Sequence, residues 1–314
     1  MEVLQKLKRR AKTKYLQSSV LGSLIDLNNE RKSHYLKATQ CCNVGAVQDK
    51  KLFMFYCKSR VCQVCNRNRS GRLMNQYMKT LEQRQMRFVT LTIPNVDEER
   101  LADSVAQMKH AFLRIRRKWA YQGRNLNGLY TTEITYNWKA DTYHPHIHAL
   151  IECTADESLY IIADWFAYWD KRGIKLSRYA QDERPADKGA FSEVFKYAIK
   201  FDYGLPDENG KIRLKYTAQA VDNILAAIWG KRMVITFGDV RALDEEYQEE
   251  AILQWHEEND AYIWHTHDWW SVTTGEALAN YSPEYVTKQL SRRRIGGPPK
   301  VGQVNNEAPK ACEA

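Results

Sequence analysis

The chain contains the stretch Tyr143-His144-Pro145-His146-Ile147-His148-Ala149-Leu150-Ile151, in which three histidines run directly into an apolar segment. The apolar residues predict a buried strand. His146 and His148 are two residues apart and so project from one face of that strand. A single histidine more often packs or titrates without binding a ligand, but three within five residues favour a site where two imidazoles hold a divalent cation. A strand supplies the rigid support that a catalytic site needs.

Length and composition place the chain among globular proteins. It has 314 residues, of which 44% are hydrophobic, enough for one large domain or two smaller ones. No apolar run approaches the roughly 18 residues of a membrane span, and the N-terminus opens into charged residues in place of an export signal. We therefore expect a soluble, cytoplasmic protein without a membrane partner.

Charge is segregated along the chain. The net charge is +9, but residues 1–90 hold 19 Lys and Arg against 5 Asp and Glu, whereas residues 241–270 hold one Arg against nine acids. A basic N-terminal third is typical of a nucleic-acid-binding protein, and it is equally typical of a solvated basic surface. Charge alone does not separate these two interpretations.

Five of the seven cysteines, Cys41, Cys42, Cys57, Cys62 and Cys65, fall within 25 residues. Without an export signal, a metal site is favoured over a disulfide framework. The Cys62-x-x-Cys65 spacing is typical of structural zinc sites, and Cys57 with one of Cys41 and Cys42 would complete a tetrahedral shell. We take Cys42 as the fourth ligand, and the alternative is a set of reduced, buried cysteines.

The N-terminal residues 1–36 have a helical apolar period interrupted by Lys6, Lys8, Arg9 and Arg10. This helix is either a basic arm on DNA or a helix packed on the next domain, and periodicity does not choose. Neutralising these four residues would flatten the salt dependence of DNA binding only if the arm contacts DNA.

Alternation and helical period predict the remaining elements. Strands are expected at 52–56, 88–93, 128–136, 143–151 and 232–237. Helices are expected at 66–85, 159–169, 191–200, 216–229 and 241–258, and a further long helix begins at residue 97. The loop between the strands at 128–136 and 143–151 is short, so these two strands are antiparallel neighbours. Glu133 on the first can therefore face His146 and His148 on the second. The order predicts an α+β fold, an antiparallel sheet with helices on one side.

Composition and motifs divide the chain into five segments. These are a basic helical arm (1–40), a zinc knuckle with a basic helix (41–86), a catalytic domain (87–240), an acidic helical extension (241–290) and a disordered basic tail (291–314). No GxxxxGK nucleotide-binding motif occurs.

Three motifs together resemble the rolling-circle replication initiators of small bacterial plasmids, which belong to the HUH (His-hydrophobe-His) endonucleases. In chain order they are Phe88-Val89-Thr90-Leu91-Thr92-Ile93-Pro94-Asn95, then His144 to Ile151, then Glu193-x-x-x-Tyr197-x-x-Lys200. The resemblance covers roughly residues 40–240, with a cysteine knuckle of the kind such initiators carry. It implies a ferredoxin-like palm.

The resemblance also implies a reaction. His146 and His148 would bind a divalent ion, and Tyr197 would attack a phosphodiester in single-stranded origin DNA, giving a 5′-phosphotyrosine and a free 3′-OH primer. A phenol has a pKa of about 10, so it needs a nearby cation or base and a polarised phosphate. A metal with open positions supplies Lewis-acid activation. Lys200 lies one helical turn beyond Tyr197 and completes the catalytic group.

Two further roles follow from position. Glu133 is the only acid on the neighbouring strand, so we take it as the third ligand of a Mg²⁺ or Mn²⁺ ion, with a surface carboxylate as the alternative. His144 could substitute or act behind the ligands. Glu193, one turn from Tyr197, could orient the phenol, accept its proton or activate a water, and the last role occurs in one group of these initiators; the alternative is a surface pair with Lys196 or Lys200.

Other functions remain open on the sequence alone. A transposase or a relaxase shares the two-histidine and tyrosine chemistry, although relaxases usually carry the tyrosine before the histidines. A zinc-knuckle DNA-binding regulator without activity would leave both catalytic motifs unexplained. An initiator binds double-stranded origin DNA and cleaves it as a single strand, and without an ATPase motif it implies a host helicase and a DNA polymerase as partners.

Overall fold

The structure is a computed structural model that describes residues 2–48, 51–195, 203–206, 212–214, 216–243, 253–254 and 260–283. Its helices are α1 (Glu2–Asp26), α2 (Lys32–Thr39), α3 (Gln63–Glu82), α4 (Glu98–Tyr121), α5 (Ala155–Asp170), the 3₁₀ turn η1 (Arg178–Ala180), α6 (Lys188–Val194) and α7 (Ala218–Ile228). Within these described residues no helix is long and apolar enough to cross a membrane.

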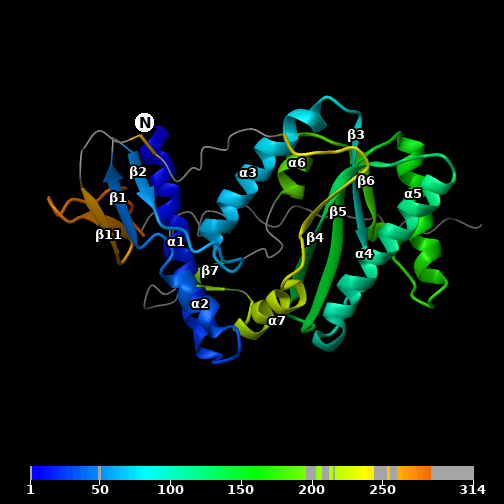
Figure 1. Ribbon diagram of the computed structural model, residues 1–314. Helices are drawn as coiled ribbons and strands as arrows, with labels where there is room; N and C mark the ends of the chain where they lie inside the picture. The colour runs from blue at the N-terminus through cyan, green and yellow to red at the C-terminus, as the bar shows by residue number, and fades with distance from the viewer. Residues whose placement is uncertain are drawn as a thin grey trace, which may run out of the picture.

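The strands form three sheets. They are β1 (Val44–Gln48), β2 (Lys51–Met54), β3 (Met86–Thr92), β4 (Asn127–Asn137), β5 (Thr142–Glu152), β6 (Asp182–Pro185), β7 (Tyr203–Pro206), β8 (Ile212–Leu214), β9 (Val234–Phe237), β10 (Leu253–Gln254), β11 (Ala261–His265) and β12 (Asp268–Ser271). A small sheet has the order β10-β2-β1-β11-β12, a larger sheet the order β6-β3-β5-β4-β9, and β7 pairs with β8. Figure 1 shows the small sheet beside α1 at one end, the larger sheet at the other, and α3 running between them.

All strand pairs of the larger sheet are antiparallel, and β5 lies at its centre. The predicted pairing of the two long strands is confirmed, with Leu129 opposite Leu150 and Glu133 opposite His146. On the other side of β5, Thr90 is opposite His148. Residues directly opposite one another share a face of the sheet, so Thr90, Glu133 and the two histidines lie on one face.

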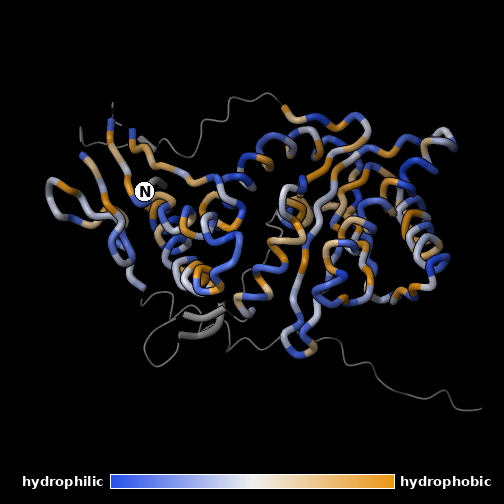
Figure 2. Tube along the Cα trace, turned by 60° about the horizontal axis from the view of Figure 1, so that its bottom comes forward, coloured by the Kyte–Doolittle hydropathy of each residue, from blue (hydrophilic) through white to orange (hydrophobic). Residues whose placement is uncertain are grey.

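Both faces of the larger sheet are covered, which corrects the prediction of helices on one side. Ile147 and Ala149 pack into the core that contains α4 and α5, whereas Leu150 packs with Phe88 against α6 and the C-terminal half of α3. Figure 2 shows hydrophobic residues alternating with hydrophilic ones along these elements. Near their middle the strands carry apolar side chains on both faces of the sheet. Each apolar face has to be covered, so a second layer of helices packs on the second face.

The two long helices on the first face begin at capping side chains. Asp97 accepts a hydrogen bond from the Arg100 backbone N–H at 3.0 Å, and Thr154 forms a capping box with Glu157. Beyond the first cap, the predicted apolar stripe of α4 is buried from Leu101 to Trp119. These helices therefore form the support on which the sheet rests.

The small sheet joins distant parts of the chain. Strand β11 pairs antiparallel with β1, placing Ile263 opposite Val44, and β10 pairs with β2. The helix predicted over 241–258 is therefore wrong at β10, and the acidic extension is strand at β11 and β12; residues 244–252 and 255–259 lie outside the described residues.

Helix α1 is packed and is not a free arm. Leu7 and Ala11 are fully buried in the core, and Arg10, 7% exposed, lies over the Tyr56 ring and contacts the Met54 sulfur at 3.4 Å. Of the two interpretations left open by periodicity, the structure therefore supports the packed helix. Lys8 and Arg9 are the exposed basic residues of that stretch.

A buried ion pair fastens α2 to α7. The Asp222 carboxylate, 1% exposed, accepts hydrogen bonds from Arg31 Nε at 2.8 Å and from the Tyr35 hydroxyl. Burial raises the pKa of Asp222, but Arg31 and Tyr35 outweigh it and hold the pKa below its usual value. This contribution to stability is therefore present above about pH 4 and is lost as the pH falls through the lower folded-state pKa.

We expect Asp222→Ala to lower the free energy of unfolding by about 3–5 kcal/mol, because it removes the carboxylate from a fully buried Tyr35 hydroxyl and a mostly buried Arg31 guanidinium. Glu30→Ala is the matched control, since Glu30 also contacts Arg31 but is 81% exposed, and it should cost less than about 1 kcal/mol. Urea unfolding at neutral pH measures both. Equal, small losses would show that the pair does not fasten the helices.

Candidate functional site

Three metal-ligand side chains meet on the face of the larger sheet that carries α6. His146 Nε2 and His148 Nε2, both on β5, each lie 3.3 Å from Glu133 Oε2 on β4, and all three side chains are buried. Metal–ligand distances of about 2.0–2.2 Å put two ligands of one ion roughly 3 Å apart. The three residues lie together as the sequence predicted, and their donor set is compatible with one divalent ion that has positions left for other oxygens.

Hydrogen bonds behind the histidines set their orientation. His146 Nδ1 lies 3.2 Å from the backbone carbonyl of His144, which can only accept, so Nδ1 carries a proton and Nε2 is the nitrogen that faces the site. His148 Nδ1 lies 3.2 Å from the Thr90 hydroxyl, and the His148 ring stacks on Phe88 at 5.2 Å. Such contacts hold both Nε2 atoms toward Glu133.

The Glu133 carboxylate is held in its charged form. Burial by itself raises the pKa of this carboxyl, but hydrogen bonds and charge from His146 and His148 outweigh burial and bring the pKa well below its ordinary value. A carboxylate that is ionised and already directed at two imidazole nitrogens is an effective cation ligand.

His144 lies beside this group and not within it. Its Nδ1 is 2.9 Å from the side-chain oxygen of Asn95, and its ring centroid is 5.6 Å from that of His146. Burial lowers the pKa of His144, which keeps the ring neutral at neutral pH. Among the described residues, the compact ligand group is Glu133, His146 and His148.

The third motif reaches the same site through α6. This helix begins at Asp187, whose side chain accepts from the Ala190 N–H at 2.7 Å, and it carries Glu193 to 3.9 Å from His148 Nε2. Arg184 on β6 lies 3.8 Å from the other oxygen of Glu193 and 4.5 Å from the centre of the Phe88 ring. Tyr197 and Lys200, the other two residues of the motif, lie outside the described residues.

A second candidate metal centre lies where α3 begins. Four thiols gather with all their sulfurs within 4.8 Å of one another, Cys41, Cys57, Cys62 and Cys65. Zinc–sulfur bonds of about 2.3 Å put tetrahedral sulfurs roughly 3.8 Å apart, close to the 3.5 Å between Cys41 and Cys65 and the 3.6 Å between Cys57 and Cys65. The group fits a closed tetrahedral ion.

Cys41 takes the place that we assigned to Cys42. The Cys42 sulfur lies 3.8 Å from that of Cys41 but is not part of the four-sulfur group. Cys42 has φ +55°, and its backbone N–H donates to the Phe55 carbonyl at 2.8 Å. This left-handed conformation separates the directions of two adjacent side chains, and only one of them enters the group.

Hydrogen bonds among the thiols shift their pKa values in opposite directions, upward for Cys41, Cys62 and Cys65 and downward for Cys57. Hydrogen bonds from the other three thiols, that of Cys41 foremost, hold the pKa of Cys57 far below its ordinary value. The Lys14 ammonium, 4% exposed, donates to the Cys41 carbonyl at 2.5 Å and to Asn43 Oδ1 at 2.6 Å. Burial lowers the pKa of Lys14, and the neighbouring thiols, Cys42 first, raise it. A buried lysine of α1 thus lies beside the cysteine centre and is hydrogen-bonded to the backbone of Cys41.

Sequence reasoning missed three contributors. Thr90 had a signal, because alternation from Phe88 places it on the face opposite the core of α4. Arg184 and Lys14 had none: each is one of many basic residues, and only the packing of β6 and of α1 brings them to the two sites.

Comparison with known proteins gives one family and several relatives. Residues 50–270 match the family Rep_1, described as replication protein. The chain is 26% identical over 166 residues to a protein rep of Streptococcus pneumoniae serotype 2, covering 46% of this chain and 52% of the relative. It is 36% identical over 160 residues to a protein rep of Staphylococcus aureus, covering 46% and 69%, and 35% identical over 135 residues to one of Lentilactobacillus hilgardii, covering 39% and 42%. The matched regions thus span between 42% and 69% of the length of these relatives. No solved structure matches it.

Proposed function

Because this chain belongs to the Rep_1 family of replication proteins, we propose that it initiates rolling-circle replication of a plasmid by nicking one strand of origin DNA. The observation that carries this proposal is the convergence of separate motifs on one sheet face. Glu133, His146 and His148 form the ligand group, and α6 brings Glu193 to 3.9 Å from His148. A DNA-binding regulator without activity would have no use for this arrangement.

The proposed fold is the palm of the HUH endonucleases. In its support, the larger sheet is wholly antiparallel, the two histidines project from its central strand, and the third-motif helix α6 packs on the same face. The histidine pair therefore has rigid neighbours on both sides, as catalysis requires.

In the proposed reaction Tyr197 is the nucleophile. Its phenolic oxygen attacks the scissile phosphorus, the bond from phosphorus to the 3′ oxygen breaks, and that oxygen leaves as the 3′-OH primer while the 5′ phosphate stays on the tyrosine. A Mg²⁺ or Mn²⁺ ion, when bound by His146, His148 and Glu133, would polarise the phosphate as a Lewis acid. Arg184, 3.8 Å from Glu193, supplies positive charge at the edge of the site, and we assign the same role to Lys200.

We assign Glu193 to the end of the cycle. Its carboxylate is 35% exposed and faces both His148 and Arg184, so it is accessible to water at the edge of the site. A carboxylate in this position can take the proton of a water that attacks a phosphodiester. Hydrolysis would release the strand without leaving a covalent link, and so would limit a further round of replication.

The split between these two residues is testable. Tyr197→Phe should give no nick and no covalent adduct, because the nucleophile is gone, whereas Glu193→Ala should nick and form the adduct but fail to release DNA at termination. The measurement is nicking of supercoiled DNA carrying the neighbouring origin, with and without Mn²⁺, followed by gel detection of the adduct. If Glu193→Ala loses the first nick as fully as Tyr197→Phe, Glu193 activates the tyrosine instead. Wild-type protein that never nicks would favour the regulator.

The remaining assignments follow from this function. The protein binds origin DNA as a duplex and cleaves it as a single strand. A host helicase would unwind the duplex, and a host DNA polymerase would extend the 3′-OH primer. The four cysteines would hold a structural Zn²⁺. A transposase would share the nick, and loss of plasmid replication on deleting the gene distinguishes an initiator from it.

A further inference from the structure

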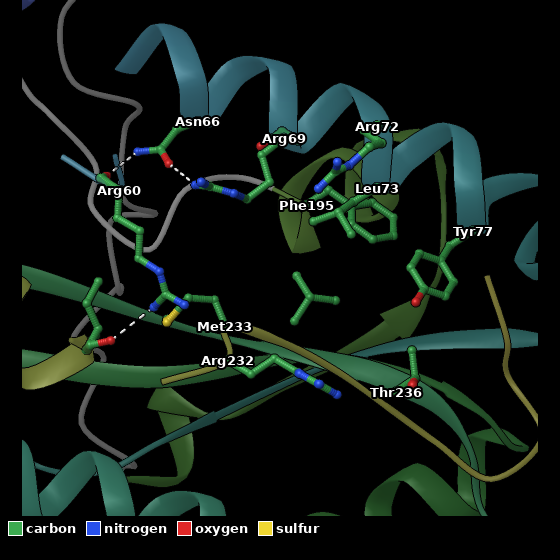
Figure 3. A pocket seen from close by; sticks show the side chains of 13 residues that line it. Arg60, Asn66, Arg69, Arg72, Leu73, Tyr77, Phe195, Arg232, Met233 and Thr236 are labelled. Atoms are coloured by element: carbon green, nitrogen blue, oxygen red, sulfur yellow. Dashed lines mark hydrogen bonds between the residues drawn. The ribbon is translucent and has the colours of Figure 1, made fainter. Parts of the chain in front are cut away.

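A cleft with a volume of about 320 Å³ lies between α3 and the edge strand β9. Figure 3 shows Arg72 and Tyr77 reaching from α3 toward the sheet, with Arg232 and Thr236 on the facing wall. The volume falls within the range of roughly 300–1,000 Å³ that small-ligand sites have. It is too small for a DNA duplex, but it is large enough for part of a single strand.

The lining of this cleft is strongly basic. It contains four arginines, Arg60, Arg69, Arg72 and Arg232, and no acidic residue. Arg60 donates to the carbonyls of Ile228 and Lys231, and Arg69 to the side chain of Asn66 at 2.5 Å. These two are therefore fixed by the protein itself.

The other two arginines stand at the mouth of the cleft without such partners. Within the part of the chain that the structure describes, the exposed side chains of Arg72 and Arg232 make no hydrogen bond or ion pair. Two guanidinium groups on opposite walls, with no carboxylate between them, create a positive potential that a phosphate would neutralise. The cleft thus has the positive charge that an anion-binding site requires.

Aromatic and apolar surface lies between the charges. Tyr77 and Phe195 stack with their planes 13° apart and their centres 6.1 Å apart, and Leu73 and Met233 complete the apolar part of the wall. Phe195 is buried, whereas Tyr77 is only partly buried and keeps ring surface open to the cleft. An aromatic face beside cationic side chains is the combination that binds single-stranded nucleic acid without regard to sequence.

Strand register connects this cleft to the candidate metal site. Val234, on the cleft wall, is opposite Thr131 on β4, and Thr131 is opposite His148 on β5. All three therefore lie in one row on one face of the sheet. Because neighbouring strands are about 4.8 Å apart, the row puts the cleft wall about 10 Å from His148. A strand seated in the cleft would therefore lie about 10 Å from the metal ligands.

We propose that this cleft binds the single strand of DNA beside the scissile phosphodiester. Arg72 and Arg232 contact successive phosphates from the two walls, and Tyr77 stacks on a base. This assignment rests on the proposed nicking function for its biological meaning, although the binding itself needs no catalysis. It adds a route by which the strand is held in register with His146, His148 and the tyrosine.

The test is the salt dependence of binding to a fluorescein-labelled 20-nucleotide oligo(dT), measured by anisotropy in buffer without Mg²⁺ or Mn²⁺. Arg72→Gln and Arg232→Gln should each weaken binding about tenfold and reduce the slope of log K against log salt by about 0.7, since one phosphate contact is lost. Arg117→Gln is the matched control, an exposed arginine of α4 on the other side of the sheet, and it should leave both quantities unchanged.

Tyr77 supplies the second arm. Tyr77→Leu should weaken oligo(dT) binding about tenfold without changing the salt slope, because stacking carries no charge, and Tyr77→Phe should retain wild-type affinity. Circular dichroism of each variant excludes loss of fold. If the arginine variants keep the wild-type slope, or if they weaken binding to a 20-base-pair duplex as much as to oligo(dT), the cleft is not a single-strand site.

The same measurements separate this proposal from the proposed function. Protein that binds oligo(dT) through the cleft but never nicks DNA would overturn the function and leave the cleft in place. Protein that nicks, but whose Arg72 and Arg232 variants bind with unchanged slope, would overturn the cleft alone.

Discussion

His146→Ala and His148→Ala should each reduce metal-dependent nicking by at least about 100-fold while leaving binding to duplex DNA within about twofold. Each substitution removes one nitrogen of a three-residue ligand group whose members lie 3.3 Å from a shared carboxylate oxygen. Substituting a residue that hydrogen-bonds to a metal ligand lowers metal affinity or activity by roughly 10–100-fold. Loss of a ligand itself should lower nicking activity further. Duplex binding depends on basic surface and not on this site.

Two measurements make this expectation specific. Thr90→Val removes the hydroxyl 3.2 Å from His148 Nδ1 but keeps both ligands, so nicking should fall by about 10–100-fold and recover in part at higher Mn²⁺. The alanine variants should also lose Mn²⁺ binding measured by calorimetry on the unreacted protein. Nicking at the wild-type rate in either histidine variant would contradict the metal assignment.

The ligand group was predictable because it depends only on regular strand geometry. His146 and His148 are two residues apart on a strand, so they share a face. A short loop places β4 beside β5, and the register of the two strands puts Glu133 opposite His146 on that face. Long, strongly periodic elements such as α4 and β5 were predictable for the same reason. Tyr197 and Lys200 lie outside the described residues, so their part of the site remains a prediction.

The remainder of the fold depends on long-range packing that no local pattern encodes. Strand β11 pairs with β1 across more than 200 residues of sequence, and its acidic neighbourhood favoured a helix instead. The second helical layer depends on α3 and α6 meeting over Leu150. Cys41 and Cys42 are identical in type and adjacent, and a positive φ at Cys42 decides between them. Positive φ is uncommon outside glycine and gives no sequence signal here.

Because Cys41 belongs to the four-sulfur group and Cys42 does not, serine substitutions at these two adjacent cysteines should have very different effects on stability. Cys41→Ser should release the bound zinc and unfold the region around α1, α3 and the small sheet, whereas Cys42→Ser should retain both zinc and fold. A closed four-thiolate site contributes folding free energy directly, with an apparent zinc-binding free energy of about 10–16 kcal/mol in small zinc domains. Because whole domains are stable by only about 5–15 kcal/mol, one missing ligand is enough to unfold this part of the chain.

The experiment combines elemental analysis of purified protein with thermal melting followed by circular dichroism. Wild type and Cys42→Ser should each hold one zinc per chain and melt together, and Cys62→Ser should match Cys41→Ser, since both sulfurs belong to the group. Cys153→Ser serves as a control for a buried cysteine far from the cluster in sequence and should change neither measurement greatly. Zinc lost from Cys42→Ser but retained by Cys41→Ser would reverse the assignment of the fourth ligand. A wild-type protein without zinc would leave the four thiols as packed, reduced cysteines beside the Lys14 ammonium, which donates to the Cys41 backbone carbonyl.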